Sequence, residues 1–194
     1  MNRLTRILAA TVLAATSLAA TAAPVTYAFD TVHSRVTFYV NHFGYSNSVG
    51  EFKLGDGTLS FDADSWSNSQ VAVTIPAQSL DLGDEKWNAH VQSADFLDVA
   101  KSPEIRFVSR RLEKLADNSG RLYGDLTIKG VTRPVVLELR LNGAGEHPMR
   151  KTPAVGFTAT TTVKRSDFGV AAYLPAVGDE LEVRIEIEAF VPKA

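Results

Sequence analysis

The chain has 194 residues, a formal net charge of −2 and no cysteine. Without cysteine it can form neither a disulfide nor a thiolate metal site, and it offers no cysteine for lipid attachment. Acidic and basic side chains are interspersed rather than grouped, which argues against binding to nucleic acid or strong attraction to anionic membranes.

The first predicted element is a cleavable signal peptide over residues 1–22. Two arginines precede an apolar run at residues 7–20, and small residues follow it. Thr and Ser interrupt the run, which is shorter than the roughly 20 apolar residues of a membrane-spanning helix. We therefore expect cleavage after Ala22 and export to the periplasm, with an N-terminal membrane anchor as the alternative.

Residues 23–194 are predicted to form one domain built from β-strands. Apolar and polar side chains alternate over several stretches, which is typical of strands with one buried face. The inward sets, in chain order, are Val36, Phe38, Val40; Val71, Val73, Ile75; Ile105, Phe107; Leu122, Leu126, Ile128; Val135, Leu137, Leu139, Leu141; and Leu181, Val183, Ile185, Ile187, Ala189. Short turns rich in Gly and Asn between these stretches indicate antiparallel hairpins.

These strands predict an all-β fold, an eight-stranded antiparallel barrel with one short helical segment after the fourth strand region. Nine-residue strands span about 30 Å, and closure into a barrel removes the bare edges of so long a sheet. The helical segment lies within residues 84–99, where Trp87, Val91 and Ala94 recur at helical spacing.

Alternation alone does not decide whether the barrel interior is filled or open. Six positions on the presumed inner faces are small or hydroxylic, namely Ser34, Ser79, Ser109, Gly124, Ala159 and Thr161. They favour an open interior weakly, because a packed core would use larger aliphatic side chains.

No residue pattern indicates catalysis, a cofactor or a metal ion. The four histidines form no metal-binding motif. Ser34 and His42 share a strand face but lie about 26 Å apart, too far for a nucleophile and its base. Residues 167–169 match the kinase Asp-Phe-Gly triplet by chance, since the other kinase motifs are missing. We therefore predict a non-catalytic protein.

Two residues are candidates for polar contacts at the barrel mouth, Arg165 and His42. Arg165 could meet a polar or phosphorylated lipid head group. The preferred interpretation is a rim ion pair with Asp167, which alternates with it on one strand face.

Several short blocks resemble the YceI-like polyisoprenoid-binding proteins, in that family's order. The blocks are residues 33–38, 42–44, 50–52, 79–80, 93–99, 102–103, 107–109, 124–134 and 165–169. Phe96-Leu97 departs from the Phe-Phe that is common in the family, a difference that concerns channel width or length. The resemblance implies an extended, lipocalin-like, eight-stranded barrel, often exported, that holds a long polyisoprenoid chain, with an isoprenoid quinone as an alternative ligand.

We therefore predict a periplasmic carrier of a long-chain isoprenoid lipid. The side chains expected to line its channel are Val36, Phe38, Val40, Phe61, Val73, Ile75, Phe107, Leu126, Ile128, Phe157, Val183 and Ile185. The alternatives are a stress-response interaction module with a filled barrel, and an enzyme acting on a bound lipid through converging polar residues, namely Ser34, His42, Ser109 and Arg165. The prediction allows transient membrane contact and a homodimer.

Overall fold

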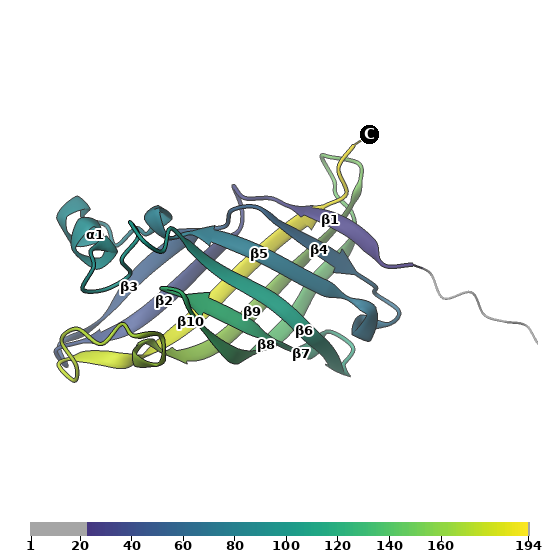
Figure 1. Ribbon diagram of the computed structural model, residues 1–194. Helices are drawn as coiled ribbons and strands as arrows, with labels where there is room; N and C mark the ends of the chain where they lie inside the picture. The colour runs from purple at the N-terminus through teal and green to yellow at the C-terminus, as the bar shows by residue number, and fades with distance from the viewer. Residues whose placement is uncertain (1–22, 194) are drawn as a thin grey trace, which may run out of the picture.

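The computed structural model describes residues 23–193 (Figure 1). The predicted signal peptide, residues 1–22, lies outside the described residues. Within residues 23–193 no helix is long and apolar enough to cross a membrane.

Ten strands form one antiparallel sheet. They are β1 (Val25–Phe29), β2 (Arg35–His42), β3 (Ser46–Lys53), β4 (Gly57–Phe61), β5 (Gln70–Pro76), β6 (Glu104–Ala116), β7 (Ser119–Ile128), β8 (Val131–Glu146), β9 (Pro153–Lys164) and β10 (Val177–Phe190). Eight of them close into a ring in the order β1-β4-β5-β6-β7-β8-β9-β10, because β1 also pairs with β10. The predicted eight-stranded antiparallel barrel is confirmed, and β2 and β3 extend it.

A break at residues 30–34 divides what would otherwise be one long strand into β1 and β2. Both strands pair with β10, β1 with its end and β2 with its first part. On its other side β1 continues the ring to β4, whereas β2 pairs with β3. The free edge of β3 is joined only briefly to the chain after β5, by two backbone hydrogen bonds of 2.9 Å between Glu51 and Asp81. One half of the barrel is thus a closed ring, and the other is completed by a hairpin.

Buried polar side chains hold this break. The Asp30 carboxylate accepts hydrogen bonds from two backbone amides of the break, at 3.0 and 3.2 Å, and from Arg150 Nη2 at 2.8 Å. The fully buried Ser34 hydroxyl bonds the amide and the carbonyl of Glu188, at 3.1 and 3.3 Å. These contacts replace ladder bonds that the strand loses where it bends away from β10.

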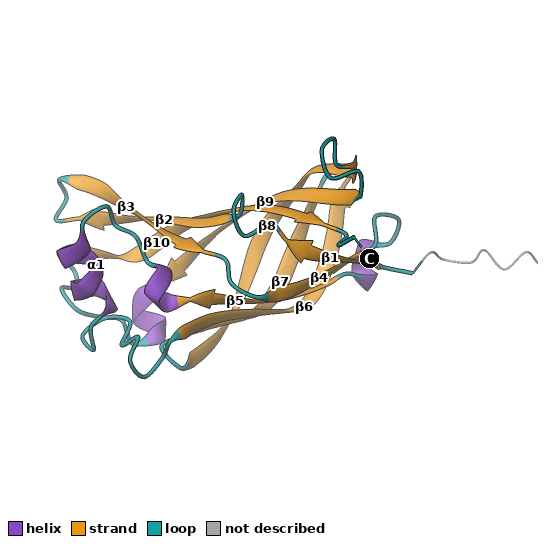
Figure 2. Ribbon diagram, turned by 90° about the horizontal axis from the view of Figure 1, so that it is seen from above, coloured by secondary structure: helices purple, strands orange, loops and turns teal. Residues whose placement is uncertain are grey.

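The barrel has two different ends (Figures 1 and 2). We call one end the mouth; it carries the β2–β3 turn (43–45), α1 (Glu85–Gln92) with the loop after it (93–99), and η3 (Arg165–Phe168) with the loop leading to β10 (169–176). We call the other end the floor; it carries η1 (Trp66–Asn68), the β6–β7 turn and the β8–β9 loop (147–152). A third short helix, η2 (Ala77–Ser79), follows β5.

The helix α1 is shorter than the predicted segment 84–99 and follows the fifth strand rather than the fourth. Asp84 caps its N-terminus, where the side chain accepts a hydrogen bond from the Trp87 amide at 2.9 Å. Helical spacing correctly placed Trp87 and Val91 in the helix, but Ala94 lies beyond its end.

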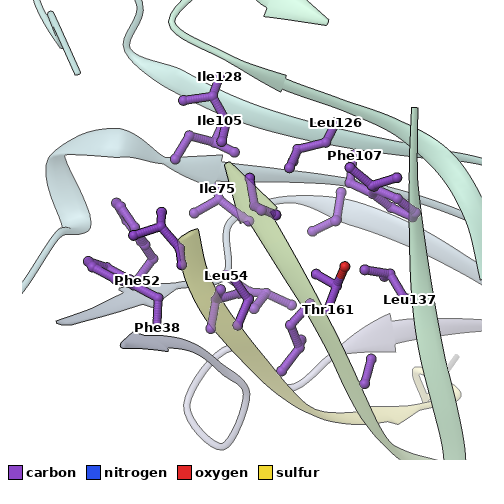
Figure 3. A pocket seen from close by; sticks show the side chains of 18 of the residues that line it. Phe38, Phe52, Leu54, Ile75, Ile105, Phe107, Leu126, Ile128, Leu137 and Thr161 are labelled. Carbon is purple, nitrogen blue, oxygen red and sulfur yellow. The ribbon is translucent and has the colours of Figure 1, made fainter. Parts of the chain in front are cut away.

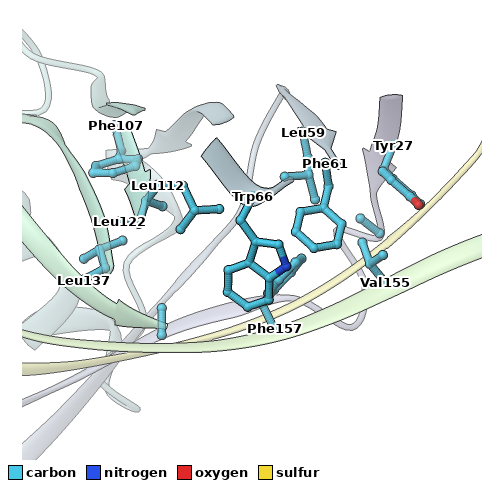
Figure 4. Packing of buried hydrophobic residues seen from close by; sticks show 12 residues of the cluster. Tyr27, Leu59, Phe61, Trp66, Phe107, Leu112, Leu122, Leu137, Val155 and Phe157 are labelled. Carbon is cyan, nitrogen blue, oxygen red and sulfur yellow. The ribbon is translucent and has the colours of Figure 1, made fainter. Parts of the chain in front are cut away.

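A packed aromatic core closes the floor (Figure 4). Phe61 and Trp66 are each only 2% exposed, and their ring centroids lie 5.7 Å apart. The Phe61 ring meets that of Phe157 edge-on at 5.1 Å. Trp66 also lies against Gly120 of β7, where an added Cβ would come within 2.9 Å of the indole. The floor is therefore tightly packed around these rings.

Candidate functional site: an apolar channel

An apolar cavity occupies the barrel interior between the mouth and the floor. Its volume is about 410 Å³, and side chains from all ten strands line it. A cavity of this size and composition is typical of a site for an apolar small molecule. A barrel filled by its own side chains, one of the alternatives from the sequence, does not fit this interior.

All twelve side chains predicted for the channel wall line this cavity, namely Val36, Phe38, Val40, Phe61, Val73, Ile75, Phe107, Leu126, Ile128, Phe157, Val183 and Ile185. Figure 3 labels Phe38, Ile75, Phe107, Leu126 and Ile128 among them. Strand alternation explains the agreement. On β10, Val183 and Ile185 face the cavity while the intervening Arg184 faces solvent. Their contact with a lipid stays a prediction.

Most of the six small and hydroxylic positions do not face the cavity as the sequence suggested. Two of the six, Ala159 and Thr161, line the cavity. The other four do not: Ser34, Ser79 and Ser109 bond backbone groups, and Gly124 lies under the Phe107 ring. The interior is open, but for four of the six positions the argument from small side chains was wrong.

His42, a predicted head-group residue, lies at the mouth and lines the cavity. It ends β2, and its ring contacts Phe43 at 4.7 Å and Trp87 of α1 at 5.9 Å between centroids. The imidazole is therefore part of an aromatic frame around the opening. It can bind a ligand edge by packing as well as by hydrogen bonding.

The remaining aromatic side chains of the mouth come from α1 and the two loops. His90 contacts Phe96 with ring centroids 5.1 Å apart, and Phe96 stacks on Tyr173 at 6.0 Å. Sequence reasoning missed Phe96 and Tyr173 because loop residues follow no period. The block at residues 93–99 that resembles the family was the available signal for Phe96.

Arg165, the second predicted head-group residue, lines the cavity but has most of its hydrogen-bonding capacity in use. Its Nε, Nη1 and Nη2 donate to the carbonyls of Gly178, Val170 and Val177, each at 2.8 Å. Asp167 is exposed, and no ion pair between it and Arg165 is found in the described chain. The guanidinium thus holds the loop after η3 and the start of β10 in place. It does not form the predicted rim ion pair.

Asp179 is the carboxylate that acts on Arg165. Burial lowers the pKa of Arg165, and the charge of Asp179 opposes that effect. Asp179 itself accepts hydrogen bonds from the amide and hydroxyl of Ser166, at 2.9 and 2.8 Å, which help to lower its pKa although burial acts the other way. These contacts fix η3 against β10 at the mouth.

The four polar residues that an enzyme acting on a bound lipid would need do not come together in the channel. Ser34 and Ser109 do not line it, and each bonds the backbone of a neighbouring strand. His42 and Arg165 do line it, at the mouth. The arrangement suits retention of an apolar molecule.

A closed antiparallel barrel with an apolar cavity and an aromatic mouth defines a lipid-binding barrel. The model of the YceI-like domain matches residues 27–189, and the chain belongs to this family.

Relatives and solved structures agree with this membership. A UPF0312 protein of Ectopseudomonas mendocina (strain ymp) is 36% identical over 187 residues, which cover 95% of this chain and 97% of that protein. The crystal structure of Burkholderia cenocepacia BcnA matches with a TM-score of 0.74 at 25% identity, over 82% of this chain and 98% of the other. A polyisoprenoid binding domain from Saccharophagus degradans shares the fold, with a TM-score of 0.64 at 12% identity, over 86% of this chain and 98% of the other.

Proposed function

We propose that this protein carries a long-chain isoprenoid lipid in its channel and catalyses no reaction. The observation that carries the proposal is the open interior, lined from all ten strands almost entirely by apolar side chains. The fold shared with a polyisoprenoid binding domain supports the choice of ligand class. Within the described channel we find no cluster of polar side chains that could catalyse a reaction on that ligand.

The energetics favour a protein that takes up and releases its lipid over one that binds it irreversibly. An isoprenoid of eight units would gain about 30 kcal/mol on leaving water, at roughly 0.8 kcal/mol per buried CH₂. That exceeds the practical ceiling of non-covalent affinity, about 18–21 kcal/mol. A lipid in a cell starts from a bilayer, however, so the net driving force is the small difference between two apolar hosts. Selectivity then depends on channel shape and on any polar contact.

The proposed place of action is the periplasm, after removal of residues 1–22. The support is the sequence of these residues, with arginines, a short apolar run and a small-residue cleavage site. Transient contact with a membrane is part of the proposal. Its support is the mouth, where Phe43, Tyr45 and Tyr173 are 49%, 93% and 56% exposed, since aromatic side chains suit a membrane interface.

Solvent extraction of the purified protein followed by mass spectrometry tests the proposal. A long isoprenoid, or a quinone that carries one, should be released. Phe38→Glu places a carboxylate in the channel wall and should abolish loading. Val49→Glu is the matched control, because Val49 is 47% exposed and does not line the channel. An empty extract from wild-type protein made in a lipid-replete host would contradict the proposal.

A further inference from the structure

Three side chains that could bind a metal ion converge at the strand break, outside the channel. Asp30 and His33 lie in the break itself, and Glu188 lies beside it on β10. One carboxylate oxygen of each acid and one imidazole nitrogen lie within 4.8 Å of one another. No sequence motif could show this group, because Glu188 lies near the opposite end of the chain.

Backbone hydrogen bonds hold the three residues in a fixed frame. The Asp30 amide donates to the Glu188 carbonyl at 2.8 Å, and the Ser34 hydroxyl bonds the amide and the carbonyl of Glu188. The Ser34 amide in turn donates to the Asp30 carbonyl at 3.0 Å, which closes the turn that carries His33. A site built on such a frame loses little conformational entropy when it binds.

The charges of this group are not balanced within the protein. Arg150 Nη2 contacts Asp30 Oδ2 at 2.8 Å, whereas the Glu188 carboxylate forms no ion pair or hydrogen bond among the described residues. Two carboxylates thus share one guanidinium. Carboxylates this close to each other repel, and a cation bound between them removes the repulsion.

The spacing of the ligand atoms suits a tetrahedral zinc ion. Zn²⁺ binds imidazole nitrogen and carboxylate oxygen at about 2.0–2.2 Å, which places neighbouring ligand atoms about 3.3–3.6 Å apart. His33 Nδ1 and Asp30 Oδ2 lie 3.2 Å apart. The side chain of Glu188 is exposed, so a change of rotamer can close the remaining distance. The imidazole favours Zn²⁺ over Mg²⁺, which prefers oxygen ligands.

We propose that Asp30, His33 and Glu188 bind one zinc ion, with water as the fourth ligand. Arg150 is the competing cation, because it contacts the same oxygen of Asp30 that lies next to His33. Its guanidinium also lies 3.8 Å from the centroid of the Phe190 ring, a contact that it can keep when the ion takes its place. The bound ion joins β10 to the segment between β1 and β2, and it stabilises the fold.

Isothermal titration calorimetry of the untagged, metal-free protein with Zn²⁺ tests the site. One ion should bind per chain, at least about tenfold more tightly than Mg²⁺. Because the ion binds the folded chain, a Zn²⁺ concentration one hundred times its Kd should raise the melting temperature by about 5–10 °C.

His33→Ala and Glu188→Gln each remove one ligand and should lower the affinity for Zn²⁺ at least about tenfold. Glu182→Gln is the matched control, because Glu182 is an exposed acid on the outer face of the same strand. Arg150→Gln removes the competing charge and should raise the affinity about tenfold. Asp30 also holds the strand break, so the two exposed ligands carry the test. Thermal unfolding without metal shows whether each variant is folded.

The variants distinguish a site from a diffuse acidic surface. Equal losses in Glu182→Gln and Glu188→Gln, or Mg²⁺ binding as tight as that of Zn²⁺, would mean that only surface charge attracts the ion. Undiminished binding by His33→Ala, or no binding by the wild-type protein, would overturn the site outright. An unchanged affinity in Arg150→Gln would contradict the competition at Asp30. None of these outcomes depends on lipid loading, so the carrier function is judged separately.

Discussion

The floor and the mouth end the same barrel in different ways. At the floor, Phe61, Trp66 and Phe157 pack together and are between 2% and 5% exposed. At the mouth, Phe43 and Tyr173 leave about half of their surface exposed, at 49% and 56%. Apolar surface removed from water stabilises a fold, whereas apolar surface left in water does not. We infer that the floor supplies stability and the mouth supplies access.

Strand pairing reinforces this division. The floor half belongs to the closed ring, in which β1 joins β10 to β4. The mouth half depends on the β2–β3 hairpin, whose outer edge has no continuous ladder to the rest of the barrel; it is joined by the bridge between Glu51 and Asp81 and by hydrogen bonds between Lys53 and Ser79. Few edge hydrogen bonds mean a low local free energy of opening. We therefore expect the mouth half to open locally at a lower free energy than the floor half.

The largest expected effect separates the two ends by stability. Trp66→Ala leaves a cavity beside Phe61 and should lower the free energy of unfolding by about 3–5 kcal/mol. Tyr173→Ala at the mouth removes an exposed ring and should change it by less than about 0.5 kcal/mol. Chemical denaturation measures both. Equal losses would mean that the mouth is as much a folding core as the floor.

A pair of glycines gives the next largest contrast. A Cβ at Gly124 would lie 2.4 Å from Phe107 Cζ and 2.6 Å from the Val108 carbonyl oxygen, so backbone must move. At Gly50 the added Cβ would meet side-chain ends only, Phe38 Cζ at 2.4 Å and Leu82 Cδ2 at 2.7 Å, which can shift into the channel. We expect Gly124→Ala to cost about 1–3 kcal/mol.

Gly50→Ala should cost less in unfolding free energy but should reduce lipid loading, because the displaced Phe38 ring narrows the channel. Gly143→Ala serves as the control for both variants, since no atom lies within 4 Å of its added Cβ. Denaturation and mass spectrometry of extracts provide the measurements. Strong destabilisation of Gly50→Ala would show that the side chains around Gly50 cannot shift. Full lipid loading of this variant would show that the shifted Phe38 ring does not narrow the channel.

The channel wall could be read from the sequence, whereas at the mouth only His42 and Arg165 could be placed and the loop residues could not. A period of two assigns each strand residue to a face, and one face of a barrel is its interior, so positions such as Val183 and Ile185 followed directly. Tyr173 lies in a loop, where no period operates. Its neighbours are set by contacts with α1 and the 93–99 loop, which are distant in sequence.

Polar side chains that hydrogen-bond backbone groups were the second feature that the sequence did not predict. Ser34 was assigned to an inner face by alternation, but the strand breaks there and its hydroxyl bonds β10 instead. Arg165 was predicted to face a ligand or Asp167, whereas it donates to the carbonyl of Val170 in the following loop and to two carbonyls at the start of β10. Sequence pattern identifies polar residues on a face, but backbone irregularities decide what those residues bond.

The strand break joins the two halves and gives a smaller, pH-dependent effect. The pKa of Asp30 is lowered to about 2: burial acts to raise it, but hydrogen bonds from His33, Arg150 and the backbone outweigh burial. A carboxyl whose folded pKa lies below its unfolded pKa stabilises the fold above the unfolded value, near 4, and loses this contribution as pH falls toward 2.

The size expected for this contribution is on the order of 1–2 kcal/mol, since the partners of Asp30 are partly exposed. Asp30→Asn should lower stability at pH 7 and flatten its decline between pH 4 and pH 2. Urea denaturation across this range measures both effects. Asp95→Asn, in the exposed part of the 93–99 loop, should leave the profile unchanged. An unaltered profile in Asp30→Asn would show that the break does not depend on this carboxylate.

The smallest effect on stability should accompany an effect on function. Tyr45 is 93% exposed at the mouth and Met149 is 86% exposed at the floor, so replacing either by serine should change unfolding free energy by less than about 0.5 kcal/mol. If the mouth meets the bilayer, Tyr45→Ser should slow transfer of lipid from vesicles, because an aromatic anchor is lost, while Met149→Ser should not. Equal slowing in both variants would mean that exposed apolar surface matters wherever it lies, and the proposed division between the two ends would fail.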